Sequence, residues 1–183
     1  MGQKPIIISI AAVSGGGKTT ITNGLKKRLD NAKALYFDQY EFDKSPTDIC
    51  KWVEDGADYN EWNLESLITD IQCILDDPTI RYIILDYPFA YLNDNISDCI
   101  DLAVYVDTPL DIAMARRITR DYSNNKWENI QSDLTNYLLR GRLAYLEMEK
   151  SVKPSSDIIL DGSLSIEMIV EKIITEIKRK SRF

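Results

Sequence analysis

Histidine is absent from the 183-residue sequence. This absence excludes Ser–His–Asp and Cys–His catalytic sets, and it excludes metal sites that are built on histidine ligands. A general base in this protein must therefore be a carboxylate, a lysine or a tyrosine.

Cysteine is scarce, and the three examples are Cys50, Cys73 and Cys99. Their odd number and wide spacing fit neither a disulfide framework nor a zinc site, which favours a reducing compartment. The N-terminus lacks a basic segment followed by an apolar stretch and a small-residue cleavage site, so no export signal is expected. Together these features predict a cytoplasmic protein.

Long apolar runs and an excess of basic residues are also missing. The longest apolar run, residues 6–13, is interrupted by Ser9 and is far too short to span a bilayer, so no membrane partner is expected. The net charge of −7 argues against sequence-independent binding to nucleic acid. The composition, with 44% hydrophobic and 28% charged residues, predicts one globular domain over residues 1–183. The sequence leaves open whether the chain forms a homo-oligomer.

The most informative stretch is the glycine-rich segment AAVSGGGKTT at residues 11–20. It follows a predicted strand and precedes a segment with helical spacing, which is the context of a phosphate-binding P-loop. Backbone N–H groups and the helix N-terminus would form an anion cradle, with Lys18 at the β- and γ-phosphates of ATP and the Thr19 hydroxyl on Mg²⁺. The residues predicted to bind the phosphates are Ser14, Gly15, Gly16, Gly17, Lys18, Thr19 and Thr20. Ala12 stands where the pattern has glycine, and a glycine-rich turn with an incidental lysine is the alternative.

Short apolar runs alternate with helical patterns along the chain, which predicts an α/β fold of the P-loop NTPase class. Strands are predicted at residues 5–10, 34–37, 80–85, 101–106 and 157–160, which gives a parallel five-stranded sheet flanked by helices. Helices are predicted at residues 21–29, 46–54, 61–75, 127–149 and 166–177, and Leu138 is expected on the apolar side of the fourth of these. A further helix is expected to begin with Thr108 as N-cap, Pro109 at N1 and Asp111 at N3, and to break at Ser123, Asn124 and Asn125.

Acidic residues end two of the predicted strands, at Asp38 and Asp86. Ligands of open α/β sheets gather at the carboxyl ends of the strands, so both side chains are expected near the P-loop. Asp86 ends an apolar strand as a Walker-B carboxylate does, which predicts that it holds Mg²⁺ with Thr19, directly or through water. Asp38 is predicted to accept the proton of an acceptor hydroxyl or to serve the metal. The alternatives are a strand-end cap for Asp86 and a solvated turn for Asp38.

Arginines gather in the segment 110–128, which is predicted to be a small lid. Arg116 and Arg120 are four residues apart and share one helix face, so they are expected to act on the transferred phosphoryl group. Arg117 is expected to bind the nucleotide. The alternative is a solvated face whose arginines form ion pairs. Four aromatic residues after Asp38 could stack on an acceptor ring or pack in the core: Tyr40, Phe42, Tyr59 and Trp62.

Several segments together resemble the uridine kinase and nicotinamide riboside kinase group. They are VSGGGKTT at residues 13–20, YFD at 36–38, DYNEW at 58–62, VDTP at 106–109, ARRITRD at 115–121, KP at 153–154 and DIILDG at 157–162. The resemblance implies a nucleoside-monophosphate-kinase-like fold, with the last of these segments beside the adenine of ATP. It also implies that the aspartate at position 38 activates the acceptor hydroxyl.

The resemblance does not extend to the segment with which uridine kinases hold the pyrimidine. Uridine kinases carry a tyrosine- and histidine-bearing hairpin before the Walker-B strand, whereas this chain has only residues 76–79 there and no histidine. The family also has glutamate after the Walker-B strand, where this chain continues as Asp86, Tyr87 and Pro88. The sequence therefore predicts an ATP- and Mg²⁺-dependent kinase that phosphorylates a hydroxyl of a small molecule, most plausibly a nucleoside or ribosyl compound. The alternative is a regulatory nucleotide-binding module that hydrolyses ATP slowly and has no small-molecule acceptor.

Overall fold

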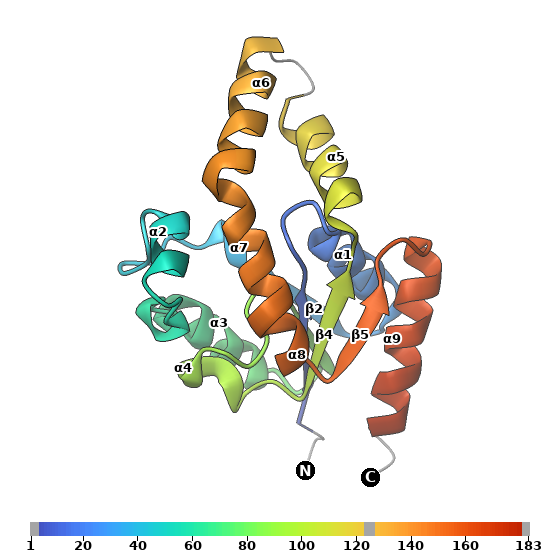
Figure 1. The fold of residues 1–183 in the computed structure, drawn as a ribbon. Helices are drawn as coiled ribbons and strands as arrows, with labels where there is room; N and C mark the ends of the chain where they lie inside the picture. The colour runs from blue at the N-terminus through green and yellow to red at the C-terminus, as the bar shows by residue number, and fades with distance from the viewer. Residues whose placement is uncertain (1–3, 123–126, 181–183) are drawn as a thin grey trace.

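A five-stranded sheet forms the centre of the protein in the computed structural model, which describes residues 4–122 and 127–180 (Figure 1). The strands are β1 (Ile6–Ala11), β2 (Ala32–Tyr36), β3 (Tyr82–Asp86), β4 (Leu102–Asp107) and β5 (Ile158–Asp161). Their order across the sheet is β2-β3-β1-β4-β5, and every neighbouring pair is parallel. The predicted parallel five-stranded α/β architecture is therefore confirmed.

Helices cover both faces of the sheet, as a buried parallel sheet requires. They are α1 (Lys18–Arg28), α2 (Ile49–Glu54), α3 (Glu65–Leu75), α4 (Asp94–Ser97), α5 (Leu110–Asp121), α6 (Trp127–Asn136), α7 (Arg142–Glu147), α8 (Lys153–Ser155) and α9 (Ile166–Lys180). Two π-helical turns, Tyr137–Gly141 and Met148–Val152, join α6, α7 and α8 into one long rod. Figure 1 shows α5 and α6 projecting beyond the ends of the strands where the P-loop lies.

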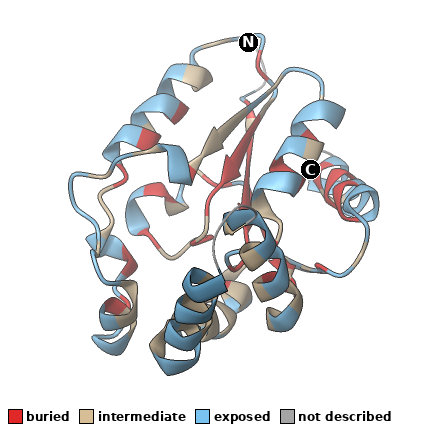
Figure 2. Cartoon of the chain, turned by 90° about the horizontal axis from the view of Figure 1, so that it is seen from above, coloured by how far each residue is buried: buried red, intermediate tan, exposed pale blue. Residues whose placement is uncertain are grey.

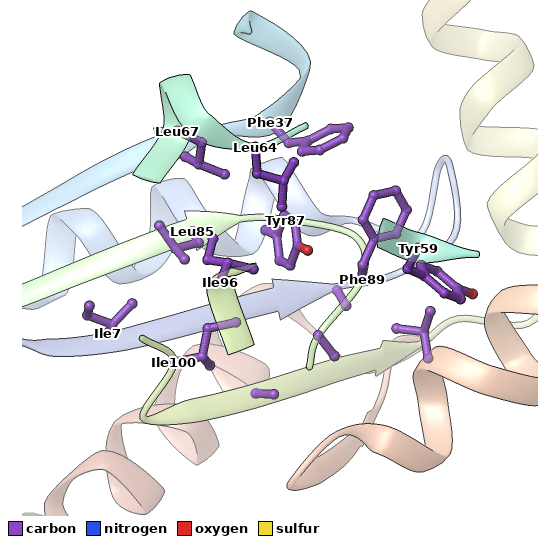
Figure 3. Close-up of a cluster of buried hydrophobic side chains, with 14 of the residues drawn as sticks. Ile7, Phe37, Tyr59, Leu64, Leu67, Leu85, Tyr87, Phe89, Ile96 and Ile100 are labelled. Carbon is purple, nitrogen blue, oxygen red and sulfur yellow. The ribbon is translucent and has the colours of Figure 1, made fainter. Parts of the chain in front are cut away.

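Each face of the sheet has its own hydrophobic core, because successive side chains of a strand point to opposite faces. Ile7 and Ile83 belong to the core that α3 covers, which also holds a group of aromatic rings (Figure 3). Ile8 and Ile84 belong to the core that α1 and α9 cover. Figure 2 shows buried residues concentrated on the strands and on the inward sides of the helices, while the outer helix surfaces are exposed. The two cores fix the sheet beneath the P-loop.

Several predicted boundaries shift once the chain is folded. The helix predicted from residue 61 begins at Glu65, because Tyr59–Glu61 forms a separate 3-10 turn. The helix predicted from residue 46 begins at Ile49, since Asp48 caps it by accepting the Lys51 N–H. The rod predicted to end at residue 149 continues to residue 155. The break predicted at 123–125 lies outside the described residues.

Two predictions about single residues are wrong. Thr108 does not cap α5, which begins at Leu110 with Pro109 at its N-cap. The Thr108 hydroxyl instead donates a hydrogen bond to the Gly16 carbonyl. Leu138, which was expected on the apolar side of the long helix, is 76% exposed.

Candidate active site

The P-loop connects β1 to α1 in the conformation that an anion cradle requires. Gly15 and Gly17 have φ angles of 79° and 101°, in the left-handed region that favours glycine. The Gly16 N–H donates to the Val13 carbonyl at 2.8 Å and closes the turn. Ala12, at the position where the pattern has glycine, is buried and packs in the core below the loop. The loop therefore tolerates alanine at that position.

The loop is held in place by close contacts with two other segments. A Cβ on Gly15 would lie 2.1 Å from the Ala113 carbonyl oxygen, so α5 approaches the loop as closely as glycine permits. The buried Thr108 hydroxyl donates to the Gly16 carbonyl at 2.8 Å. A Cβ on Gly162 would lie 1.9 Å from the same hydroxyl oxygen. Thr108 and α5 therefore hold the P-loop, and the loop after β5 packs against Thr108.

Lys18, Thr19 and Asp86 form a connected group at the foot of the loop. The Thr19 hydroxyl donates to Asp86 Oδ2 at 2.6 Å, and Lys18 Nζ lies 3.2 Å from Asp86 Oδ1. Asp86 is only 3% exposed, and its Oδ1 accepts no hydrogen bond from the residues that the structure describes. A buried carboxylate needs positive charge beside it, and Lys18 supplies that charge in this structure.

This donor set fits Mg²⁺. The ion prefers hard oxygen ligands, keeps several waters, and is usually bound by one or two protein groups together with substrate phosphates. The Thr19 hydroxyl and the Asp86 carboxylate supply such groups. Among residues 4–122 and 127–180 there is no cluster of three or more acidic, cysteine or histidine side chains that would hold a metal alone. Phosphate and water would therefore complete the coordination.

A cavity of about 740 Å³ opens above the P-loop. Besides the loop itself, its lining includes Asp38, Pro88, Arg116, Arg120, Met148, Gly162, Leu164 and Ile166. Leu164 and Ile166 add apolar surface to a lining that also carries charged side chains. The fold thus brings to one cavity four groups that the sequence placed apart: Lys18, Asp38, Arg116 and Arg120.

The three arginines of α5, Arg116, Arg117 and Arg120, have different surroundings. Arg116 reaches the Gly162 carbonyl at 3.4 Å and lines the cavity. Arg120 also lines the cavity; its hydrogen bond to Asp121 raises the pKa of its guanidinium, and the charge of Asp38 contributes to this rise. Arg117 is not among the lining residues, because its guanidinium forms an ion pair with Asp133 of α6. Arg120 also forms an ion pair, with Asp121, and its side chain is largely exposed, so the alternative of a solvated, ion-paired face fits Arg120 as well; the ion pair of Arg117 is mostly buried.

The aromatic residues after Asp38 pack against one another. The Phe42 and Trp62 rings lie 4.7 and 5.4 Å from the Phe37 ring, and Tyr59 lies 5.2 Å from Phe89. These rings belong to or border the core that α3 covers (Figure 3). The Tyr40 hydroxyl donates to Asp70 instead of facing the cavity. In this structure Tyr59 belongs to the core, the other three predicted aromatics pack against it, and none of the four is among the residues that line the cavity.

Two contributors to the site were missed in the sequence. Thr108 was assigned to helix capping, although its partner is the P-loop 92 residues away. Tyr145 of α7 interacts with the Ser14 hydroxyl; burial raises the pKa of this tyrosine, while Arg117 and Ser14 act in the opposite direction. No local sequence pattern signals either contact, because the partners lie far apart in the chain. Only the resemblance of the VDTP segment to the kinase group marked Thr108.

These features define a class of protein. A P-loop between β1 and α1, with the β3 aspartate against its threonine, is an α/β P-loop nucleotide-binding site. The all-parallel five-stranded sheet with flanking helices matches that class. No helix of the described residues is long and apolar enough to cross a membrane.

Comparison with known proteins places the chain more narrowly. No family model matches it. A uridine kinase of Ligilactobacillus salivarius is 26% identical over 209 residues, covering 98% of each chain. A uridine kinase of Bacillus subtilis (strain 168) is 26% identical over 210 residues, covering 99% of each. The chain is thus a homologue of the uridine kinases over nearly its whole length.

Solved structures support the same fold. A sugar kinase from Janibacter sp. HTCC2649 has a TM-score of 0.58 at 18% identity, covering 93% of each chain. The deoxyadenosine kinase of M. mycoides has a TM-score of 0.50 at 14% identity, covering 95% of this chain and 99% of that one. The protein has the fold of the P-loop kinases, and the curated proteins it resembles are uridine kinases.

Proposed function

We propose that the protein is an ATP- and Mg²⁺-dependent phosphotransferase that phosphorylates a hydroxyl group of a small nucleoside or ribosyl compound. The observation that carries the proposal is the single cavity that holds Lys18, Asp38, Arg116 and Arg120 above the P-loop. A phosphoryl-transfer site needs a phosphate cradle, cations around the moving group and an oriented acceptor. The uridine kinase homologues support the same reading.

Each group has a role in this proposal. Residues 14–20 hold the phosphates, and Lys18 balances charge on the β- and γ-phosphates. Mg²⁺ at Thr19 and Asp86 would neutralise further charge on the phosphates. Arg116 and Arg120 face the transferred group, while Arg117 holds α5 against α6 through Asp133. Asp38 takes the proton of the acceptor hydroxyl while the oxygen of that hydroxyl bonds to the γ-phosphorus. The bond between the γ-phosphorus and the β–γ bridging oxygen breaks, and ADP is released.

The acceptor differs from uridine in how it would be held. Between the end of α3 at Leu75 and the start of β3 at Tyr82 the chain has only a short turn, in which the Thr79 N–H and hydroxyl donate to Asp77. No hairpin from this connection reaches the cavity. The cavity lining that is available for an acceptor includes Asp38, Pro88 and Met148. We therefore extend the proposal to nucleosides and ribosyl compounds as a class.

The test is ADP release from MgATP with a panel of nucleosides, ribosides and small polyols. Lys18→Ala removes the cradle cation and should abolish release, whereas Lys27→Ala changes an exposed lysine of the same helix and should leave the rate unchanged. Release that depends on one acceptor, and vanishes only in Lys18→Ala, supports the kinase and identifies its substrate. Full activity in Lys18→Ala overturns the mechanism. Slow release that ignores every acceptor but needs Lys18 favours the regulatory nucleotide-binding module.

A further inference from the structure

Arg117 of α5 lies between the P-loop and α6. A Cβ on Gly15 would lie 3.2 Å from the Arg117 Cβ, so the arginine side chain starts beside the backbone that cradles the phosphates. Its guanidinium reaches α6 and contacts both oxygens of the Asp133 carboxylate, with 3.4 Å between Nη1 and Oδ1. Arg117 therefore stands next to the P-loop with its charge engaged by a residue of another helix.

The ion pair between Arg117 and Asp133 is mostly buried. The two side chains are 17% and 19% exposed, whereas those of the neighbouring pair, Arg120 and Asp121, are 62% and 35% exposed. Salt screens a buried pair much less than an exposed pair. The charge of Asp133 therefore acts strongly on its surroundings, which include the phosphate-binding loop.

The Arg117 guanidinium keeps one donor in reserve. Its Nε is buried and has no hydrogen-bond partner among residues 4–122 and 127–180. A buried donor without a partner costs free energy, so the side chain gains from any arrangement in which a further acceptor reaches it. Arg116 and Arg120 of the same helix line the cavity, whereas Arg117 does not. Asp133 thus holds a cation beside the P-loop that is only partly used.

Tyr145 of α7 connects this pair to the P-loop. Its hydroxyl interacts with the Ser14 hydroxyl. Burial raises the pKa of Tyr145, and the charge of Arg117 lowers it, so the phenol lies within reach of the guanidinium. The Tyr145 ring packs edge-on against the Tyr137 ring at 5.2 Å. The P-loop, α5 and the long rod therefore meet around Arg117.

We propose that Asp133 is a positioning residue that withholds Arg117 from the nucleotide phosphates, so that the nucleotide is bound less tightly and released faster. The proposal rests on the proposed function, because it requires the P-loop to bind a nucleotide. A guanidinium binds carboxylate and phosphate through the same paired N–H donors, so the two anions compete for Arg117. Loss of the Asp133 charge frees Arg117 to donate to the phosphates.

A brace without this competition predicts a different result. If the pair only holds α5 against α6, loss of either charge loosens the P-loop and weakens nucleotide binding. Competition predicts opposite signs for the two partners. Binding tightens when Asp133 loses its charge, and it weakens when Arg117 loses its charge, because Asp133 is then an unbalanced negative charge beside the phosphates.

The experiment is calorimetric titration of the full chain with MgADP. Asp133→Asn keeps the size of the side chain and one acceptor oxygen, and it should lower the Kd roughly tenfold to hundredfold, the range of one added hydrogen bond to a charged group. Asp133→Ser, which leaves room for water at the guanidinium, should act in the same direction. Arg117→Met should raise the Kd. Asp133→Glu keeps the charge and should bind as the wild type does.

Two controls separate the role of Asp133 from a general charge effect. Glu128→Gln makes an equal charge change at an exposed position of the same helix and should leave the Kd unchanged. In the Arg117→Met background, Asp133→Asn should change the Kd far less than it does in the wild-type chain, because Asp133 acts through Arg117. Circular dichroism of each variant separates changed binding from lost folding.

Two results would overturn the proposal. They are neutral variants of Asp133 that bind MgADP no more tightly than the wild type, and an equal tightening with and without Arg117. The titration needs neither an acceptor nor turnover. A wild-type chain that binds MgADP but phosphorylates no acceptor overturns the kinase alone, whereas a wild-type chain that does not bind MgADP overturns this proposal as well.

Discussion

The contact between Thr108 and the P-loop offers a sharp test of how the site is held. The Thr108 hydroxyl is buried and donates to the Gly16 carbonyl at 2.8 Å. Thr108→Val keeps the shape of the side chain but removes the donor. The carbonyl oxygen of Gly16 is then left in the protein interior without this partner. The variant therefore isolates one hydrogen bond that joins the loop after β4 to the P-loop.

The cost of Thr108→Val follows from burial. Leaving a buried carbonyl unsatisfied costs about 1–3 kcal/mol of unfolding free energy. The added methyl group must also fit against Gly162, whose Cα already approaches the hydroxyl closely. For a chain of this length the loss corresponds to a fall in Tm of roughly 2–12 °C. The P-loop should also lose its fixed geometry, so the KM for ATP should rise.

Urea unfolding, thermal unfolding and ATP-dependent kinetics measure these effects. Thr108→Ser is the matched control, because it keeps the donor and loses only a methyl group, about 0.8 kcal/mol. It should retain the wild-type KM for ATP. A valine variant with wild-type stability and wild-type KM would show that the hydrogen bond does not hold the loop. A serine variant with the same KM defect as valine would lead to the same conclusion.

Three further predictions concern the base, the P-loop and acid stability. Asp38→Asn should lower kcat roughly 10²- to 10⁴-fold in the acceptor-dependent assay. A near-normal rate would show that Asp38 is a solvated turn residue and not the general base. Gly15→Ala should lower the free energy of unfolding in urea by more than Gly56→Ala does. Both glycines have a positive φ, but only at Gly15 would the new Cβ meet the Ala113 carbonyl. Equal losses of stability in the two variants would contradict this packing argument. Burial by itself raises the pKa of Asp157, but the hydrogen bonds that the carboxylate accepts outweigh burial and hold the pKa below the ordinary 3.8. The ionised carboxylate therefore stabilises the fold above pH 3.8, and this stabilisation is lost as the pH falls through the pKa of the folded state. Asp157→Asn should therefore destabilise the protein most near neutral pH, with a smaller difference near pH 3 in urea titrations, and a difference that grows on acidification would contradict the sign.

Much of the architecture could be predicted from the sequence because it is local. The apolar run before the P-loop and the helical spacing after it predicted β1 and α1 within one to three residues of their observed ends. All five strands were found in their correct places along the chain. The boundaries at Asp48 and Glu65 were less accurate, because capping contacts and a separate 3-10 turn determine them.

The roles of the arginines and aromatics depend on distant partners. Spacing alone placed Arg116 and Arg120 on one helix face, and both line the cavity. Spacing gave no sign that Arg117 would pair with Asp133 across the lid. The aromatic residues after Asp38 suited either a binding surface or the core. Their packing around Phe37 decided between the two in this structure.

The sequence by itself determined the phosphate-binding loop, the aspartate just after β2, the aspartate that ends β3, and the absence of any histidine chemistry, because these depend only on residue type and local backbone geometry. The tertiary structure decided the strand order, the cavity that unites Lys18 with Asp38, and the bracing of Gly16 by Thr108. It also decided that Leu138 and Leu139 of the long rod stay exposed. These properties arise from contacts between residues far apart in the chain, for which no short stretch of sequence carries a signal.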